Sequence, residues 1–291
     1  MLGIIGGSGL YQIDGLRDTQ WVAVRSPFGT PSDALLIGEL AGERLCFLPR
    51  HGRGHRIPPS DINYRANIDV LKRVGVTDVL SLSAVGSLRE DLAPGTFVVV
   101  DQFLDRTVSR ERSFFGPGMV AHVPMADPVC PRLGAVVGEA ALTAGLPVHR
   151  GGTYVVIEGP QFSTRAESML YRQWGGDVIG MTNLPEARLA REAELCYATV
   201  AMVTDFDCWH PDHGEVTVDR VMAVMAANLS QARGLIGHVA TRLAQHPAQC
   251  PHQCDRALDA SIVTPVEARD PSLVARLDAV AGRVLRPEGR G

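Results

Sequence analysis

Short apolar runs recur along the chain, and most of their positions are continuously hydrophobic rather than alternating with polar ones. Runs of this kind, rich in β-branched residues and bounded by Gly or Pro, predict strands that are buried on both faces of a sheet. We place strands within residues 3–7, 44–50, 76–87, 95–105, 152–160, 177–182 and 196–205.

Amphipathic stretches lie between several of these runs and predict helices at residues 63–75, 131–145, 165–175, 184–194 and 217–245. In the last of them five apolar residues fall at helical spacing, so most are expected in the core: Val218, Val221, Met222, Met225 and Leu229. Strands that alternate with helices predict an α/β fold, here a single-domain, mixed, largely buried β-sheet flanked by helices. Residues 110–131 and the tail after Gln245 lack a period, which is typical of functional or interfacial loops.

Composition and charge limit the kinds of molecule that this protein is expected to bind. The chain has 291 residues, 45% of them hydrophobic, and a formal net charge of −4. An acidic balance without Lys/Arg runs argues against nucleic acid. No apolar segment is long enough to span a bilayer and no basic leader follows Met1, so we expect a cytoplasmic protein without a membrane partner.

The six cysteines do not form a disulfide scaffold. Cys46, Cys130, Cys196 and Cys208 lie in apolar surroundings that suit small buried thiols. Cys250 and Cys254 form a CxxxC in the tail, with His246 and His252 nearby. This pair can hold zinc or form a local disulfide, but without a second cluster we expect ordinary thiols and no metal.

The glycine turn "GGSGL" follows the first predicted strand. A dinucleotide fingerprint needs another glycine three residues after Gly9, and position 12 is Gln. The alternatives are a tight structural turn, or a nest of amides that holds a smaller oxyanion together with the Ser8 hydroxyl.

Cations and hydroxyls follow other predicted strands. Arg50 and His51 end one apolar run, and Ser83, Ala84 and Thr182 end two more. Because parallel strands deliver ligand groups at their carboxyl ends, these residues predict a site for inorganic phosphate, with Arg supplying a fork and protonated His a donor. The following cations are alternatively a solvated basic loop: Arg53, His55 and Arg56.

Asp205 and Asp207 close the last apolar run at positions i and i+2, which places both carboxylates on one face of an extended chain. They can be solvated loop acids, or metal ligands together with His210 and His213. The third interpretation is the most specific: the two acids form a pair that recognises or protonates a polar heterocycle.

These motifs together resemble the 5′-methylthioadenosine phosphorylases, the trimeric branch of the purine nucleoside phosphorylase superfamily. The matching segments run in order to about Val221, and the tail diverges: "GIIGGSGL", "FGTPSDAL", "RHG", "NYRAN", "GSLRE", "DQFLDRT", "IEGPQFSTRAES", "MTNLPEA", "AREAELCYA" and "TDFDCW". The resemblance implies a nucleoside phosphorylase domain over residues 1–245 and a divergent tail over 246–291, part of which packs at a subunit interface.

The resemblance also implies a site, residue by residue. Phosphate ligands fall at Ser8, Arg50, His51, Ser83, Ala84 and Thr182. Nucleoside contacts fall at Met181, whose amide faces the sugar hydroxyls, and at Phe162, Ser163, Asp205, Phe206 and Asp207. The 5′ pocket is walled by Val218 and Val221 and, across a subunit interface, by His122 and Val263. Catalytic residues are Asp205, Asp207 and His51, without a metal or organic cofactor.

The implied reaction converts 5′-methylthioadenosine and phosphate to adenine and 5-methylthioribose 1-phosphate, a step of methionine and purine salvage. Asp205 donates a proton to the departing purine, and Asp207 selects a 6-amino purine. Ser8 and Ser83 stand where relatives commonly have Thr, Gln161 replaces a common Arg, and Asn183 occupies a variable position. These departures leave open another purine nucleoside, such as a 5′-deoxy or 5′-halogenated adenosine, adenosine, methylthioinosine or inosine.

Overall fold

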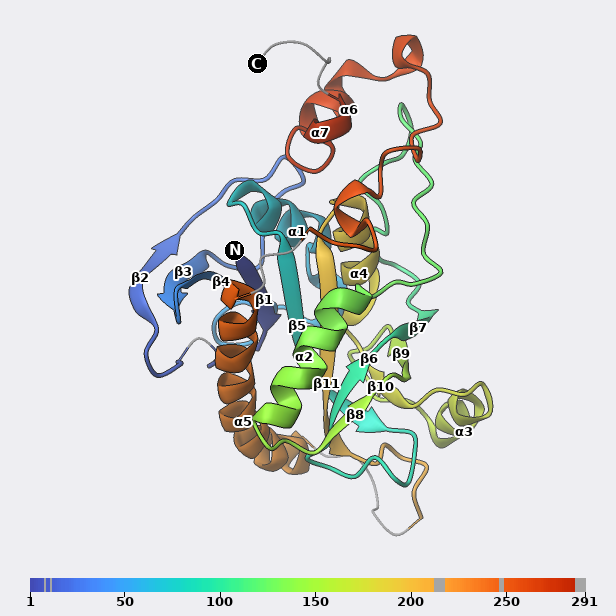
Figure 1. Cartoon of the computed structure of the whole chain (residues 1–291). Coiled ribbons are helices and arrows are strands. Elements are labelled where there is room, and N and C mark those ends of the chain that lie inside the picture. Colours follow the sequence, from blue (N-terminus) through green and yellow to red (C-terminus); the bar gives the residue numbers. More distant parts are fainter. Residues whose placement is uncertain (8, 11, 212–217, 246–248, 286–291) are drawn as a thin grey trace.

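The computed structural model describes residues 1–285 apart from 8, 11, 212–217 and 246–248 (Figure 1). The helices of this part of the chain are α1 Tyr64–Arg73, α2 Pro131–Thr143, α3 Arg165–Gln173, α4 Asn183–Glu192, α5 Val218–Gln245, α6 Pro271–Arg276 and α7 Gly282–Leu285. Short 3₁₀ turns cover Pro59–Asp61, Cys254–Arg256 and Val266–Ala268.

One mixed sheet contains all the strands of the described residues. Its strands are β1 Leu2–Gly6, β2 Arg17–Val22, β3 Leu35–Leu40, β4 Glu43–Pro49, β5 Asp78–Ser87, β6 Phe97–Val100, β7 Gln102–Arg106, β8 Val148–Arg150, β9 Thr153–Ile157, β10 Val178–Gly180 and β11 Cys196–Asp205. The main path runs β2-β3-β4-β1-β5-β10-β9-β7, and β11, β6 and β8 branch from β5.

The strand β5 lies at the branch point. On one side β11 pairs with it in parallel, from Asp78 to Gly86 of β5. On the other side β1 pairs with it only as far as Ser81, and the antiparallel β10 begins at Gly86. Residues 82–85 therefore lie between the two neighbours, and we call this segment the β5 gap.

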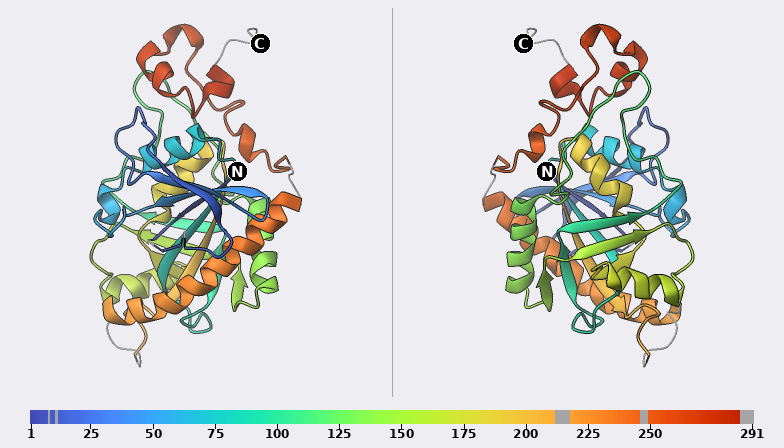
Figure 2. Two further views of the ribbon diagram at one scale, coloured as in Figure 1. Left: turned by 90° about the vertical axis from the view of Figure 1, so that its left-hand side faces the viewer. Right: turned by 90° about the vertical axis from the view of Figure 1, so that its right-hand side faces the viewer.

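Two layers of helices cover the sheet, as Figures 1 and 2 show. The side chains of α1 and α4 pack into one core cluster, and those of α2 and α5 pack into the other. The strands carry mostly buried side chains because both of their faces meet helices. The predicted α/β fold with a flanked, largely buried sheet is confirmed, and no helix of the described residues is long and apolar enough to cross a bilayer.

Two predictions about elements need correction. The strands β2, β3 and β8 were not predicted, and β2 is an edge strand whose polar, exposed residues form no apolar run. In α5 the first two turns are not in the core, since Val218 is 66% and Met222 62% exposed. Buried positions begin at Asn228 and recur on one helix face from Ala232, where the helix packs into the core cluster shared with α2.

The described part of the tail folds back over the domain. Leu258, Leu273 and Leu277 join the core cluster beneath α1 and α4, and Asp278 forms an ion pair with Arg73 of α1. The tail also pairs with the aperiodic loop, because Ala121 and Ile262 form an antiparallel bridge. The division into a 1–245 domain and a 246–291 tail stays a prediction.

Candidate active site

The β5 gap opens to solvent in the middle of an otherwise buried strand. Ala84 and Gly86 are partly exposed, whereas Leu82, Ser83 and Val85 are buried. The carboxyl end of β1 lies beside it, since Ile5 pairs with Ser81. The end of β4 adjoins that of β1, because the Arg50 N–H donates to the Gly6 carbonyl at 2.9 Å. Strand ends that converge on open backbone give an α/β sheet its ligand site.

A buried ion pair supports this opening from below. Arg50 is 2% exposed, and its Nε and Nη2 donate to the two carboxylate oxygens of Glu186 at 2.9 and 3.1 Å. Nη2 also donates to Ser81 at 2.5 Å, and Nη1 donates to the Leu82 carbonyl at 3.0 Å. These bonds use four of the five guanidinium N–H groups and leave one on Nη1 for a ligand.

The same carboxylate orders a wider network. Glu186 Oε1 also accepts from Ser81 at 2.7 Å and from Tyr197 at 2.9 Å. Asn183 donates to Tyr197 at 2.8 Å and accepts from Ser83 at 3.1 Å. Arg50 is thereby connected to Ser83 in the gap through side chains that are all buried, and such fully paired networks hold their members rigidly.

His51 is held through one ring nitrogen. Its Nδ1 lies 2.8 Å from the Ile57 carbonyl, which only accepts, so Nδ1 carries the proton and Nε2 has the free lone pair. Burial, with smaller contributions from Arg50 and His55, lowers the pKa of His51 to about 4. The unliganded ring is therefore neutral at pH 7, and its expected role as a cationic donor requires a proton that arrives with the ligand.

The predicted hydroxyls differ in their surroundings. Thr182 is the N-cap residue of α4, and its buried Oγ1 makes no hydrogen bond of normal geometry within the described residues. A buried hydroxyl without a partner is suited to a ligand that accepts a hydrogen bond, such as an anion. The continuous helical part of α4 begins only after Leu184, whose φ and ψ are −122° and 136°, so the suitability rests on the hydroxyl and not on the helix dipole. Ser8 lies outside the described residues, so the predicted glycine-turn donor has no structural account.

The remaining cations of the loop are not brought into this network. Arg53 is half exposed and binds Asp33 at 2.9 Å, and Arg56 donates to the Arg53 carbonyl. His55 stacks on His51 with ring centroids 4.2 Å apart. The geometry favours the solvated-loop interpretation for both arginines.

The two acidic residues lie at the other end of the gap. Asp205 is paired in register with Gly86, and a Cβ placed on Gly86 would stand 3.0 Å from Asp205 Oδ1. Asp205 accepts from the Thr204 hydroxyl at 2.7 Å and from the Asp207 N–H at 2.8 Å. Asp207, at a φ of 51°, accepts from Ser168 of α3.

Burial changes the acidity of both carboxyls. It raises the pKa of Asp205, and it raises the pKa of Asp207 to about 6, with the neighbouring Asp205 adding to the effect. Acids with raised pKa values in an open site are candidates for proton transfer. A left-handed non-glycine residue such as Asp207 is also more frequent at functional sites than elsewhere.

The residues expected at the nucleoside lie around this pair. Phe206 is 8% exposed, and its ring lies 4.9 Å from that of His210. Ser163 has a buried hydroxyl without a partner among the described residues, and its carbonyl accepts from the Cys208 thiol. Phe162 is 48% exposed in the single chain. His213 lies outside the described residues.

Arg110, which sequence reasoning missed, fixes the loops that carry these residues. The side chain is buried, and its Nη1 donates to the carbonyls of Met181 and Leu184 at 2.6 and 2.7 Å. Its Nη2 donates to the Glu158 carbonyl at 2.7 Å. Arg110 thus holds the Met181 carbonyl, and this bond fixes the orientation of the peptide groups that follow Met181.

The expected 5′ wall is divided. His122 and Val263 are neighbours, because the His122 N–H donates to the Ser261 carbonyl at 2.8 Å and the Val263 N–H donates to Val120 at 3.0 Å. Both are exposed, and their segments lie at the opposite end of the subunit from the end of β11 (Figure 1). Val218 and the partly buried Val221 follow the β11 end instead.

Asn183 also donates to Thr199 at 2.5 Å. Four members of this network were missed from the sequence: Ser81, Glu186, Tyr197 and Thr199. Asn183 and Glu186 belong to "NLPEA", where two polar residues interrupt the start of an apolar helix face. The signal was present, but a buried acid is normally unexpected without a visible cation.

Comparison with known proteins agrees with this geometry. The model of the phosphorylase superfamily matches residues 1–241. The chain belongs to the phosphorylase superfamily.

Close relatives narrow the class further. The S-methyl-5′-thioadenosine phosphorylase of Cereibacter sphaeroides is 59% identical over 98% of this chain and 99% of its own length. The enzyme of the same name from Bradyrhizobium diazoefficiens is 60% identical over 98% of both.

Solved structures agree. A methylthioadenosine phosphorylase from an Antarctic soil metagenomic library superposes with a TM-score of 0.91 at 48% identity, over 96% of this chain and 98% of that one. Methylthioadenosine phosphorylase from Schistosoma mansoni, in complex with adenine, superposes with a TM-score of 0.80 at 38% identity. The match covers 92% of this chain and 98% of that one.

Proposed function

We propose that this chain catalyses the phosphorolysis of 5′-methylthioadenosine to adenine and 5-methylthioribose 1-phosphate. It is a pentosyltransferase of the purine nucleoside phosphorylase type and acts in the salvage of methionine and purines. Phosphate is its co-substrate, and the reaction uses no metal or organic cofactor, because the nucleophile is phosphate and side chains supply the proton.

One observation carries the assignment: the two halves of the chemistry lie on the same strand. Ser83, in the β5 gap, belongs to the network that ends at Arg50. Gly86 lies opposite Asp205. Three residues of extended strand span about 10 Å. This separation leaves room for a ribose between a phosphate at one end and a purine at the other.

Phosphate binding follows from the partners already formed. The Ala84 backbone, Thr182, Ser8 and the remaining Arg50 N–H would hold the anion below the sugar. Ser83 would join them by turning its single O–H from Asn183 to the anion. The monoanion of phosphate donates its hydroxyl to neutral His51 Nε2, and transfer of that proton leaves a dianion facing a cationic ring. Positioning and charge stabilisation then assist attack on C1′.

Departure of the base requires a proton at N7. As the bond between C1′ and N9 breaks, the purine gains negative charge and the sugar becomes oxocarbenium-like. Asp205 supplies the proton as a carboxylic acid, and burial keeps its pKa raised for this purpose. Asp207, ionised above its pKa of about 6, accepts from the 6-amino group.

We infer that the working unit is a homotrimer in the cytoplasm. The apolar wall of Val218 and Val221 is incomplete within one chain, and His122 and Val263 lie too far away to complete it in the same subunit. A neighbouring subunit that presents these two residues would close the pocket around a thioether. Further apolar contact with a neighbouring subunit would come from exposed side chains, namely Met169 and Leu170 on α3 and Trp174 just after it.

A substrate panel tests the proposal. Methylthioadenosine, adenosine and inosine are each incubated with phosphate, and free base and sugar 1-phosphate are measured. We expect the order methylthioadenosine, adenosine, inosine in kcat/KM, and no turnover without phosphate. Preferred cleavage of inosine would overturn the role of Asp207, and cleavage without phosphate would overturn phosphorolysis.

A further inference from the structure

A second cluster of reactive groups lies away from the β5 gap. Cys130 is the N-cap residue of α2, Cys196 begins β11, and Cys250 and Cys254 lie in the tail. All four are buried, and their Sγ atoms lie within 4.8 Å of one another. Three segments distant in sequence thus bring four sulfurs to one point.

The spacing of these sulfurs fits a tetrahedral metal. Zinc–sulfur bonds of about 2.3 Å place the four sulfurs of a tetrahedron roughly 3.8 Å apart. Cys130 Sγ and Cys250 Sγ are 3.6 Å apart. A disulfide instead requires about 2.05 Å between its sulfurs. The observed arrangement is therefore that of four ligands around a centre, not of two bonded pairs.

Nearby charges suit a metal with four thiolates, which carries a net charge of −2. Arg191 Nη1 lies 3.2 Å from Cys254 Sγ, and Arg132 hydrogen-bonds to Cys196. Cys130 lies at the positive end of the α2 dipole. Arg191 compensates part of this charge and orients a ligand, whereas Arg132 orients Cys196 while it shares its own charge with Asp78 in an ion pair.

The tail forms a turn around its two sulfurs. Gln253 has a left-handed φ of 53°, and its N–H donates to the Cys250 carbonyl at 3.0 Å. The N–H groups of His252 and Cys254 face Cys250 Sγ. A CxxxC turn whose amides point at a ligand sulfur is a typical half of a structural zinc site.

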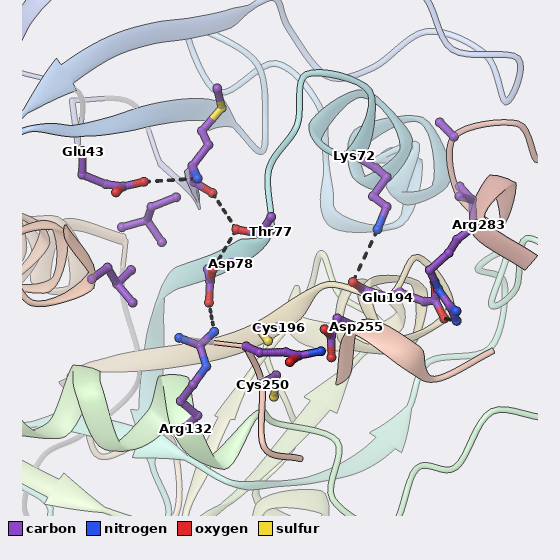
Figure 3. A pocket seen from close by; sticks show the side chains of 16 residues that line it. Glu43, Lys72, Thr77, Asp78, Arg132, Glu194, Cys196, Cys250, Asp255 and Arg283 are labelled. Atoms are coloured by element: carbon purple, nitrogen blue, oxygen red, sulfur yellow. Dashed lines mark hydrogen bonds and ion pairs between the residues drawn. The ribbon is translucent and has the colours of Figure 1, made fainter. Parts of the chain in front are cut away.

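We propose that Cys130, Cys196, Cys250 and Cys254 bind one structural zinc ion. The centre is closed, because four protein ligands leave no position for substrate, and it takes no part in phosphorolysis. A cavity of about 460 Å³ reaches Cys196 and Cys250, which line it beside Arg132 and Asp255 (Figure 3). This cavity is a route by which the ion and chelators reach the site.

The first experiment uses the purified wild-type chain, prepared with a thiol reductant and without chelators. Elemental analysis is expected to find about one zinc per chain, released when a mercurial reagent blocks the thiols. Replacement by Co²⁺ is expected to give the intense visible bands and sulfur-to-metal charge transfer of tetrahedral four-thiolate cobalt. A chain that holds no zinc and gives no such spectrum after exposure to either ion overturns the proposal.

Matched variants locate the ligands. Cys254→Ala is expected to lose at least nine-tenths of the zinc, whereas Cys46→Ala, which removes an equally buried thiol in β4, is expected to keep it. If Cys254→Ala does not fold, the cobalt spectrum of the wild type decides. A digest of the unreduced wild-type chain is searched for disulfide-linked peptides. Peptides linked through pairs of these four cysteines would show that the cluster forms disulfides instead of binding a metal, and would overturn the proposal.

Discussion

The phosphate end and the 5′ end of the candidate site are built in different ways. At the phosphate end Arg50, Glu186 and Asn183 are buried and paired within one chain. At the 5′ end Val218 is 66% and Val263 59% exposed, and Val263 is held through its backbone, whose N–H donates to Val120 at 3.0 Å. Under the proposed assignment, the difference means that reaction chemistry is organised by the subunit core, while selection of the 5′ group is left to surfaces that a neighbouring subunit would complete.

The sharpest test of the core-built half is Asp205→Asn. The amide oxygen of the introduced Asn can still accept from the Asp207 N–H, but the side chain has no acidic proton to donate. We therefore expect kcat/KM for methylthioadenosine to fall by about 10²- to 10⁴-fold. Steady-state kinetics measure it, with circular dichroism to verify folding. The exposed Asp18→Asn should retain wild-type activity. A loss smaller than about tenfold for Asp205→Asn would exclude the proposed acid.

Glu186→Gln tests the buried ion pair. It leaves the Arg50 charge without its carboxylate, so the free energy of unfolding is expected to fall by about 3 kcal/mol, and KM for phosphate should rise. Urea denaturation and phosphate titration measure the two effects.

The comparison variant for Glu186→Gln is Glu139→Gln. It breaks the exposed pair with Arg150 and should change stability by less than about 1 kcal/mol. Equal effects of the two variants would show that burial of Arg50 and Glu186 does not matter.

Asp207→Asn is expected to separate stability from activity. Burial raises the pKa of Asp207 from 3.8 to about 6, so the native state binds a proton more tightly than the unfolded chain. Stability from this group is therefore present at pH 4 and is lost as the pH rises to about 6. At pH 8 the variant should gain up to about 3 kcal/mol in free energy of unfolding, and the gain should vanish near pH 4.

Activity gives the second readout for Asp207→Asn. In the wild type, kcat/KM for methylthioadenosine should fall as the pH drops below about 6, because the protonated acid no longer accepts from the 6-amino group. The variant should lose this dependence and shift its preference toward 6-oxo purines. A pH profile unchanged by the substitution would contradict base selection by Asp207.

The smallest effect is expected at the surface-built half. Val218→Ser should alter the free energy of unfolding by less than about 0.5 kcal/mol, because the residue is exposed. The ratio of kcat/KM for methylthioadenosine to that for adenosine should nevertheless fall about tenfold, as the pocket loses apolar contact with the thioether. Leu142→Ser on α2 is the control that should leave this ratio unchanged.

The sequence was most informative where a residue acts through its own strand. Continuous apolar runs predicted the buried strands, and the last run placed Asp205 at the end of β11. The extended geometry expected through Asp207 was wrong, because Asp207 lies past the strand at a φ of 51°. Exposed β2 was missed because edge strands need no apolar run. The network around Glu186 was missed because the partners of this α4 residue come from three other segments, namely β5, β11 and the turn after β4, and pairing between segments leaves no periodic signal.

The tail cysteines show the same limit from the other side. Cys250 and Cys254 looked like an isolated pair because metal spacing is recognised locally. Their neighbours Cys130 and Cys196 come from α2 and β11, and only the fold brings the four together. The expectation of ordinary thiols rested on the lack of a second cluster nearby in sequence.

The β5 gap has a thermodynamic consequence. The backbone of this gap belongs to a strand that pairs with β11 on its other side. An anion bound in the gap would therefore occupy hydrogen-bonding groups that the sheet leaves open at the centre of the molecule. Any ligand that binds only the native state stabilises it by mass action, by about 2.7 kcal/mol at one hundred times its dissociation constant. On the proposed assignment of this gap to phosphate, the phosphate supply of the cell would raise the fraction of molecules that are folded, besides supplying a reactant.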